Sequence, residues 1–289
     1  MTAEPAAVYG VDLSAAANSA GASTWVARCI PDGESLVVEE LSSAAEFLAL
    51  DSTARDDVLP ALADELASVE APAVAGLDFP FSLPAWVLGD DDWRAFVERT
   101  PAEWGTLDDV DGPKSLFYRL NDASEDHGGR RRRGTDDEHE GQDPAGWRIK
   151  TQTYYGISML LRPLIANDRI SVPPLLSVPD PKLTAVEAYP ASLFDQLANA
   201  TRTGYKNGQR RHVKARRNNV AALRQEGVRF EGPEADDDAA DCAVATDDAL
   251  DAVAAALVAH RNYPDAVKRD YTDTECTEGK IFGLGTGRS

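Results

Sequence analysis

Residues 8–16 constrain the fold of this chain more than any other stretch. The run is short, apolar and rich in β-forming residues until it reaches Asp12, after which small residues follow. Such a run favours a buried strand over a helix. Ligands of open α/β sheets bind at the carboxyl ends of strands, so Asp12 is a candidate site residue. The alternative is a turn aspartate that hydrogen-bonds the backbone that follows it.

A second apolar run ends in the same way, at Asp78. Between the two acids, residues 24–30 and 36–41 predict two further strands of an antiparallel meander, and residues 58–68 predict a helix. A helix that returns the chain to a strand beside the first makes those two strands parallel. We therefore expect Asp12 and Asp78 to lie side by side at one edge of the sheet.

The middle of the chain shows weaker periodicity and carries an insertion. Four consecutive arginines at residues 130–133 are flanked by glycines and mixed charges. This pattern favours a mobile surface loop, with a functional basic finger as the alternative. Residues 151–167 predict a helix that Pro163 kinks or ends. The glycine-rich residues 279–287 predict a frayed tail.

Glu187 interrupts a third apolar strand, predicted over residues 183–190. A carboxylate on a buried strand needs a partner, a bound cation or a raised pKa. Glu187 is therefore a candidate site residue, and a structural glutamate in a salt bridge is the alternative.

Residues 201–224 depart from the charge of the rest of the chain. They hold eight lysines and arginines and no acid, whereas the whole chain has a formal net charge of -20. Clustered positive charge of this kind is typical of surfaces that bind phosphate or nucleic acid. The alternative is a helix face neutralised by the acidic run at residues 231–238. The candidate nucleic-acid contacts are Lys206, Arg210, Arg211, Lys214 and Arg217.

The last strong helix, predicted over residues 246–261, carries two more acids. Asp248 and Asp251 are three residues apart and so share one helix face. Acids in a first helical turn also interact favourably with the helix dipole, which is the alternative explanation.

Brought together, these acids would form a cluster of carboxylates that repel one another. A hard divalent cation relieves that repulsion, and ligands that are all oxygen favour Mg²⁺ or Mn²⁺. Two such ions about 4 Å apart would stabilise the attacking and leaving oxygens of a phosphodiester. Only four histidines occur and none has metal-ligand spacing, which argues against zinc. The candidate catalytic residues are Asp12, Asp78, Glu187, Asp248 and Asp251, and all but Glu187 are candidate metal ligands.

The amino-acid composition indicates the compartment in which the protein works. The chain has 49 acidic and 29 basic residues, and only 7 of the basic residues are lysines. We interpret this excess as adaptation to a high-salt cytoplasm, where screening reduces self-repulsion. Three scattered cysteines indicate a reducing compartment. No signal peptide is visible, and no apolar stretch is long enough to span a membrane. We therefore expect a cytoplasmic protein without a membrane partner.

The predicted order β-β-β-α-β-α-β-α, with acids on the first strand, the fourth strand and a late helix, resembles the RNase H-like superfamily and, within it, the RuvC-type resolvases. Five motifs are more narrowly similar to the domain-of-unknown-function family 429, which is regarded as a predicted RNase H-like nuclease. They are Gly10-Val11-Asp12, Leu77-Asp78-Phe79-Pro80, Glu187-Ala-Tyr189-Pro190, Asp248-Ala-Leu-Asp251-Ala252 and Glu278-Gly279-Lys280-Ile281-Phe282-Gly283.

The resemblance implies an α/β fold with a mixed five-stranded sheet flanked by helices. It implies one RNase H-like domain over residues 1–289, with an inserted loop or helical segment at about residues 86–170. Asp12 and Asp78 would be the central metal ligands, completed by Asp251 and Asp248. The implied activity is cleavage of nucleic acid, DNA or RNA, with two Mg²⁺ or Mn²⁺ ions. RuvC-type enzymes act as dimers, so a homodimer is possible here.

Two other functions stay open. Residues 10–15 also resemble the first phosphate loop of actin-like ATPases and sugar kinases, which share the fold but need a second domain and a later glycine-rich loop. A protein that keeps the fold and binds nucleic acid without catalysis is the other alternative.

Overall fold

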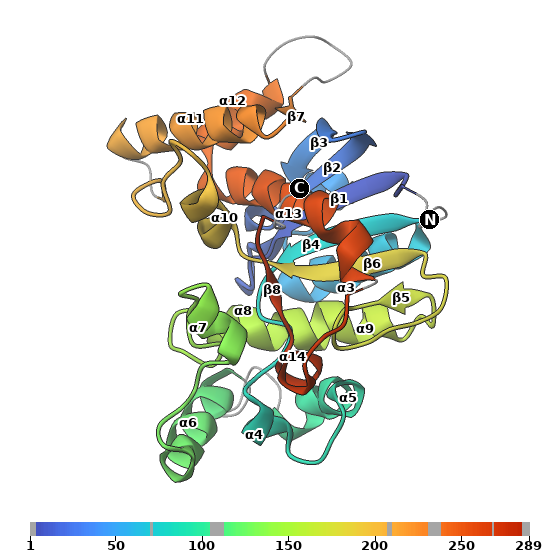
Figure 1. Cartoon of the computed structure of the whole chain (residues 1–289), viewed down its shortest axis with the longest axis vertical. Helices are drawn as coiled ribbons and strands as arrows, with labels where there is room; N and C mark the ends of the chain where they lie inside the picture. Colours follow the sequence, from blue (N-terminus) through green and yellow to red (C-terminus); the bar gives the residue numbers. More distant parts are fainter. Residues whose placement is uncertain are drawn as a thin grey trace.

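The computed structural model describes residues 4–69, 72–104, 113–206, 210–230, 238–267 and 269–284. Within them one eight-stranded sheet forms the centre of the molecule (Figure 1). Its order is β5-β6-β4-β1-β2-β3-β7, and β8 also pairs with β6. The strands are β1 (Ala7–Asp12), β2 (Trp25–Asp32), β3 (Ser35–Ser43), β4 (Ala73–Asp78), β5 (Ile170–Ser171), β6 (Leu183–Ala188), β7 (Val228–Arg229) and β8 (Ile281–Phe282).

The pairing confirms a mixed α/β sheet. Strands β1, β2 and β3 are antiparallel, while β1, β4 and β6 run parallel. The predicted order β-β-β-α-β is therefore confirmed for the first 78 residues. The prediction of five strands is wrong, because the described residues hold eight. The three additional strands, β5, β7 and β8, have two residues each, which is too short to show alternation in a sequence.

Helices cover both faces of the sheet. They are α1 (Ala20–Ser23), α2 (Ala44–Phe47), α3 (Arg55–Ser68), α4 (Ala85–Leu88), α5 (Trp93–Trp104), α6 (Pro113–Ser124), α7 (Gly134–Glu138), α8 (Lys150–Tyr155), α9 (Arg162–Ile165), α10 (Pro190–Gln196), α11 (Arg210–Gln225), α12 (Asp238–Ala245), α13 (Asp247–Ala266) and α14 (Asp273–Glu278). A 3-10 turn, η1 (Glu125–His127), follows α6, and a π-helical segment, η2 (Gly156–Leu161), joins α8 to α9.

Alternation along the strands divides the core into two layers. Tyr9 and Val11 pack with α3, α5 and the α8–α9 segment on one face of the sheet. Val8 and Val74 pack with α10, α11, α12 and α13 on the other face. Figure 1 shows α11, α12 and α13 on one side of the sheet and α8 and α9 on the other. No helix within the described part of the chain is both long and apolar enough to cross a membrane.

Helix α13 lies directly against the two central strands because these strands have no side chain at the contact. Gly10 of β1 and Gly76 of β4 are aligned in the sheet. A Cβ atom on Gly10 would lie 2.0 Å from the carbonyl oxygen of Ala252, and one on Gly76 would lie 2.1 Å from that of Ala255. Only glycine on the strands and alanine on the helix permit this approach.

The middle of the chain holds helices α4 to α7. The arginine run lies in the loop between η1 and α7, but Arg133 is fully buried, so the prediction of a mobile surface loop is wrong at that residue. Arg133 forms ion pairs with the nearby Asp136 and with Glu187 on β6, and local charge patterning does not reveal the second. The glycine-rich end is only partly a tail, since β8 pairs in parallel with β6. Residues 285–289 lie outside the described part of the chain.

Candidate metal centre

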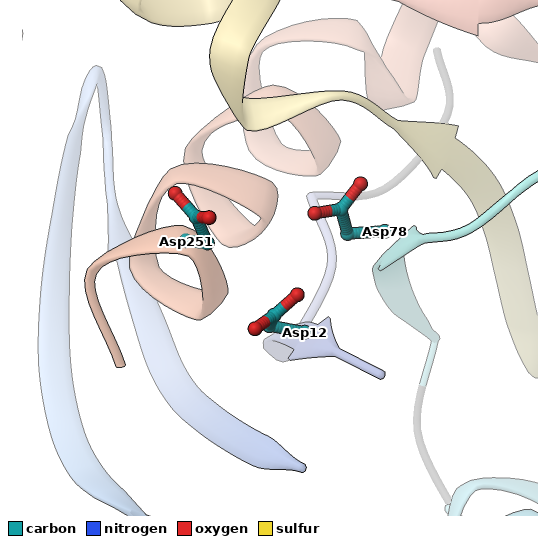
Figure 2. Close-up of side chains that lie close together, drawn as sticks. All are labelled: Asp12, Asp78 and Asp251. Atoms are coloured by element: carbon teal, nitrogen blue, oxygen red, sulfur yellow. The ribbon is translucent and has the colours of Figure 1, made fainter. Parts of the chain in front are cut away.

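Three aspartates from three different elements meet at the carboxyl ends of the central strands. Asp12 ends β1, Asp78 ends β4 and lies directly opposite it, and Asp251 lies in the second turn of α13. One carboxylate oxygen from each lies within 4.8 Å of the others. Figure 2 shows the three carboxyl groups around a common space. The predicted juxtaposition of Asp12 and Asp78 is confirmed, and Asp251 joins them.

The backbone explains why these side chains converge. Each strand carries a glycine two residues before its aspartate, and residues two apart on a strand face the same side. The face that Gly10 and Gly76 open to α13 is therefore the face that bears Asp12 and Asp78. The side-chain amide of Gln152 donates to the carbonyl oxygens of Leu13 (2.9 Å) and Asp78 (2.8 Å) and so ties the two strand ends together.

Burial raises the pKa values of all three carboxyl groups. Asp251 is fully buried, Asp12 is 8% exposed and Asp78 is partly buried. Burial and the charges of Asp78 and Asp251 raise the pKa of Asp12 well above its usual value. Burial raises the pKa of Asp78 to about 7, although Lys206 opposes the shift. Burial also raises the pKa of Asp251, again against the effect of Lys206. Carboxyl groups with raised pKa values in one place are typical of sites that hold a cation.

Lys206 is the cation of this cluster. Its ammonium nitrogen lies 2.7 Å from Asp251 Oδ2, while 54% of its side chain is exposed. Burial alone would lower the pKa of Lys206, but Asp251, Asp12 and Asp78 together raise it. The hydroxyl of the fully buried Tyr205 donates to Asp251 Oδ1 at 3.0 Å. The sequence prediction treated Lys206 as a phosphate contact and did not identify Tyr205.

Asp248 lies beside the cluster rather than within the trio. It is partly buried, and burial together with the Asp247 and Asp251 charges raises its pKa to about 6. It also interacts with the Asp12 carboxyl group. The shared helix face of Asp248 and Asp251 therefore brings both acids to the same side of the sheet.

Glu187 has a different environment, and it forms a buried salt bridge of the kind that its structural alternative describes. Both terminal nitrogens of Arg133 donate to its carboxylate, at 2.8 and 2.5 Å, and so does the backbone N–H of Phe81 at 3.0 Å. Arg133 is itself held by Asp136 at 2.7 Å. Burial raises the pKa of Glu187, and Arg133 counteracts this. Glu187 thus fixes the turn after Asp78 and is not one of the three clustered acids.

A second glutamate, not predicted as functional, extends this support. The carboxylate of the buried Glu278 accepts from the backbone N–H groups of Ala85 (3.0 Å) and Gly134 (2.7 Å). It links the last helix, α14, to the two segments that flank α5 and α6. Glu278 begins the last of the five family motifs, and this motif was the sequence signal that pointed to it.

The basic segment divides into separate roles. Arg211, Lys214 and Arg217 are exposed on α11, and the side chain of Arg210 lies outside the described part. Arg216 is buried and donates to the carbonyl oxygens of Tyr205, Val244 and Ala245. It therefore holds the residue next to Lys206 in place. Most of the acidic run proposed to neutralise α11, residues 231–237, is not described.

Comparisons with known proteins add a partial match. A family model described as "Protein of unknown function (DUF429)" matches residues 157–275. That range includes β6, Lys206 and Asp251 but neither Asp12 nor Asp78. No curated protein and no solved structure matches the chain. The resemblance to family 429 is thus confirmed over this range, and the buried aspartate cluster is consistent with a metal site.

Proposed function

We propose that this protein is a metal-dependent nuclease, with Asp12, Asp78 and Asp251 holding a Mg²⁺ or Mn²⁺ ion. The observation that carries the proposal is the convergence of three aspartates from separate elements, with oxygens within 4.8 Å of one another. Three carboxylates with one lysine leave a formal charge of about -2 in a buried place, by counting one charge for each group. Hard oxygen ligands of this kind suit Mg²⁺ and Mn²⁺.

A divalent cation bound there supplies Lewis-acid polarisation of a phosphate ester and lowers the pKa of a water molecule. The residues of the chain supply the rest. Lys206 has an exposed stem and a charged head at the cluster, so it can contact a substrate phosphate. If two ions bind, Asp248 is the additional carboxylate beside Asp12.

The proposal that nucleic acid is the substrate rests on the positive charge of α11. The exposed Arg211, Lys214 and Arg217 give α11 a positive face in a chain that is otherwise strongly acidic. Helix α11 begins four residues after Lys206, so the same stretch of chain supplies the basic face and the lysine of the cluster. Basic side chains of this kind attract and position a phosphate backbone.

Calorimetric titration with Mn²⁺ tests the cation site. We expect wild type to bind Mn²⁺ saturably, Asp12→Asn to lose binding, and the exposed Asp64→Asn to bind as wild type does. Hydrolysis of a labelled single strand and of a labelled duplex should then require Mn²⁺ or Mg²⁺ and should disappear in Asp12→Asn. Mn²⁺ binding without hydrolysis would favour a nucleic-acid-binding protein without catalysis. Absence of Mn²⁺ binding by wild type would contradict the proposal.

A further inference from the structure

A cavity of about 110 Å³ opens beside the aspartates, at the carboxyl ends of β1, β4 and β6. Asp12, Asp78 and Lys206 line one end of it. Phe79, Ile149 and Tyr189 contribute an apolar and aromatic wall. Charged and polar side chains form the rest of the lining, and small ligands of α/β sheets bind in such pockets at the carboxyl ends of strands.

Two polar groups at this cavity have no hydrogen-bond partner among the described residues. The side-chain amide of Gln142 is exposed and forms no hydrogen bond with any described residue. The same holds, among the residues described, for the hydroxyl of Tyr189, which lies just after β6. Each could form a hydrogen bond with a ligand in the cavity without breaking one within the protein.

The volume of the cavity limits the size of the ligand that it can hold. One water molecule needs roughly 10–15 Å³ of such space, so 110 Å³ holds on the order of eight water-sized groups. That is room for one planar ring and too little for a base pair. Four acids of the lining, Asp12, Asp78, Asp136 and Glu187, face two cations, Arg133 and Lys206, so a neutral ring fits the cavity better than a second phosphate.

We propose that this cavity binds the base of one unpaired nucleotide whose phosphate lies at the aspartates. The preferred substrate is then a single strand, because a duplex would first have to unstack and unpair a base. The inference rests on the proposed nuclease function and specifies its substrate. Tyr189 offers a ring on which a base can stack, with the Arg202 guanidinium 5.7 Å from the ring centroid. Gln142 offers a donor and an acceptor for the edge of the base.

The test compares labelled single-stranded dT10 with a labelled hairpin duplex, by fluorescence anisotropy in Ca²⁺, which takes the same oxygen ligands. The salt concentration is held constant, because phosphate binding weakens as salt rises. Wild type should bind dT10 roughly tenfold more tightly than the hairpin. Gln142→Trp, which fills the cavity, and Tyr189→Leu, which removes the ring, should each weaken dT10 binding by roughly tenfold.

Glu138→Trp is the matched control, since Glu138 is exposed and does not line the cavity. It should leave dT10 binding unchanged, and Mn²⁺ binding should be the same in all these variants. Equal binding of the hairpin, or unchanged dT10 binding in both cavity variants, would overturn the inference. Equal competition by thymidine 5′-monophosphate would overturn the strand assignment in favour of free nucleotides. A wild type that binds no Mn²⁺ would instead contradict the nuclease proposal itself.

Discussion

Two clusters of buried acids lie next to each other at the carboxyl ends of the central strands, and they are built in opposite ways. One comprises Asp12, Asp78 and Asp251, with Lys206 at its edge. The other, here called the arginine cluster, consists of Arg133, Asp136 and Glu187. Residues of both line the same cavity, so they share much of their surroundings. What separates them is how the protein compensates the negative charge.

The arginine cluster is complete within the protein. Glu187 accepts hydrogen bonds from Arg133 and from the backbone of Phe81. Asp136 accepts from the backbone N–H, Nε and a terminal nitrogen of Arg133. The two carboxylates outweigh the effect of burial and raise the pKa of Arg133. The groups that bond one another in this cluster come from β6, α7 and the turn after β4, so the cluster holds the inserted helices to the sheet.

The aspartate cluster has one cationic partner, Lys206, for three carboxylates among the described residues. Its one lysine contacts only Asp251 as an ion pair among the described residues, and the pKa values of all three aspartates are raised. Buried acids with internal partners hold a structure together, whereas buried acids without them are the ones available to a ligand. In the proposed function, Glu187 therefore keeps a structural role and the three aspartates hold the cation, although Lys206 and Tyr205 already contact Asp251.

The largest effect should come from removing the central cation of the arginine cluster. Arg133→Met would leave Glu187 and Asp136 buried without a counter-charge, which typically costs about 3–5 kcal/mol of stability. Urea denaturation should show this loss, and Mn²⁺ should not restore it. The control is Arg130→Met in the same arginine run, because Arg130 is 51% exposed and its partner Glu278 is 3.7 Å away. A loss below about 1 kcal/mol for Arg133→Met, the value typical of a surface pair, would contradict the contrast.

The next largest effect should come from a substitution that disturbs the geometry of the aspartate cluster and leaves its charges unchanged. Gly10→Ala would place a Cβ atom 2.0 Å from the backbone of α13, so the helix that carries Asp251 must move. Overpacking of this kind typically costs about 1–3 kcal/mol, and a clash with backbone belongs at the upper end. Both the free energy of unfolding and the Mn²⁺ affinity should fall. Gly134→Ala, whose Cβ would meet nothing closer than 3.6 Å, should change neither.

The sequence predicted the aspartate cluster well because its signals are local. Strands β1 and β4 end at acids, and a helix between strands makes them parallel, so Asp12 and Asp78 follow from pattern alone. The repeated glycine two residues before each aspartate is also visible in the sequence, but its meaning depends on the alanine face of α13. Only the packed structure shows that the helix touches the strands there.

The arginine cluster could not be predicted in the same way. Arg133 and Glu187 are 54 residues apart, and nothing in the run at residues 130–133 distinguishes the buried arginine from its neighbours. Lys206 illustrates the same limit, since a basic residue in a basic segment predicted a phosphate contact and not an ion pair with Asp251. Long-range ion pairs are decided by tertiary packing, which periodicity and spacing do not encode.

Lys206→Met sharpens the comparison, because it removes the cation of the other cluster. Asp251 would lose a charged hydrogen bond, for which about 1.5–3 kcal/mol is typical, and proton uptake by the aspartates would recover part of it. Unlike the loss in Arg133→Met, this one should be restored by Mn²⁺, which stabilises the folded state by binding it. Thermal unfolding with and without Mn²⁺ measures both. Lys214→Met on the exposed face of α11 is the control. Failure of Mn²⁺ to restore Lys206→Met would place the lysine in a purely structural role.

The aspartate cluster should also impose a pH dependence on the stability of the metal-free protein. The pKa of Asp78 is raised from 3.8 to about 7 and that of Asp248 from 3.8 to about 6. For each group, the folded state binds more protons than the unfolded state at pH values between 3.8 and the raised pKa. Stability therefore falls as pH rises through that range, by up to about 1.4 kcal/mol per pH unit for each group. Urea denaturation with a chelator should show lower stability at pH 8 than at pH 5, and Asp78→Asn should reduce the difference. Mn²⁺ affinity should change in the opposite direction, because the ligands must lose their protons to bind. A metal-free protein whose stability rises from pH 5 to pH 8, with no change in Asp78→Asn, would show that the aspartates are compensated as fully as the arginine cluster.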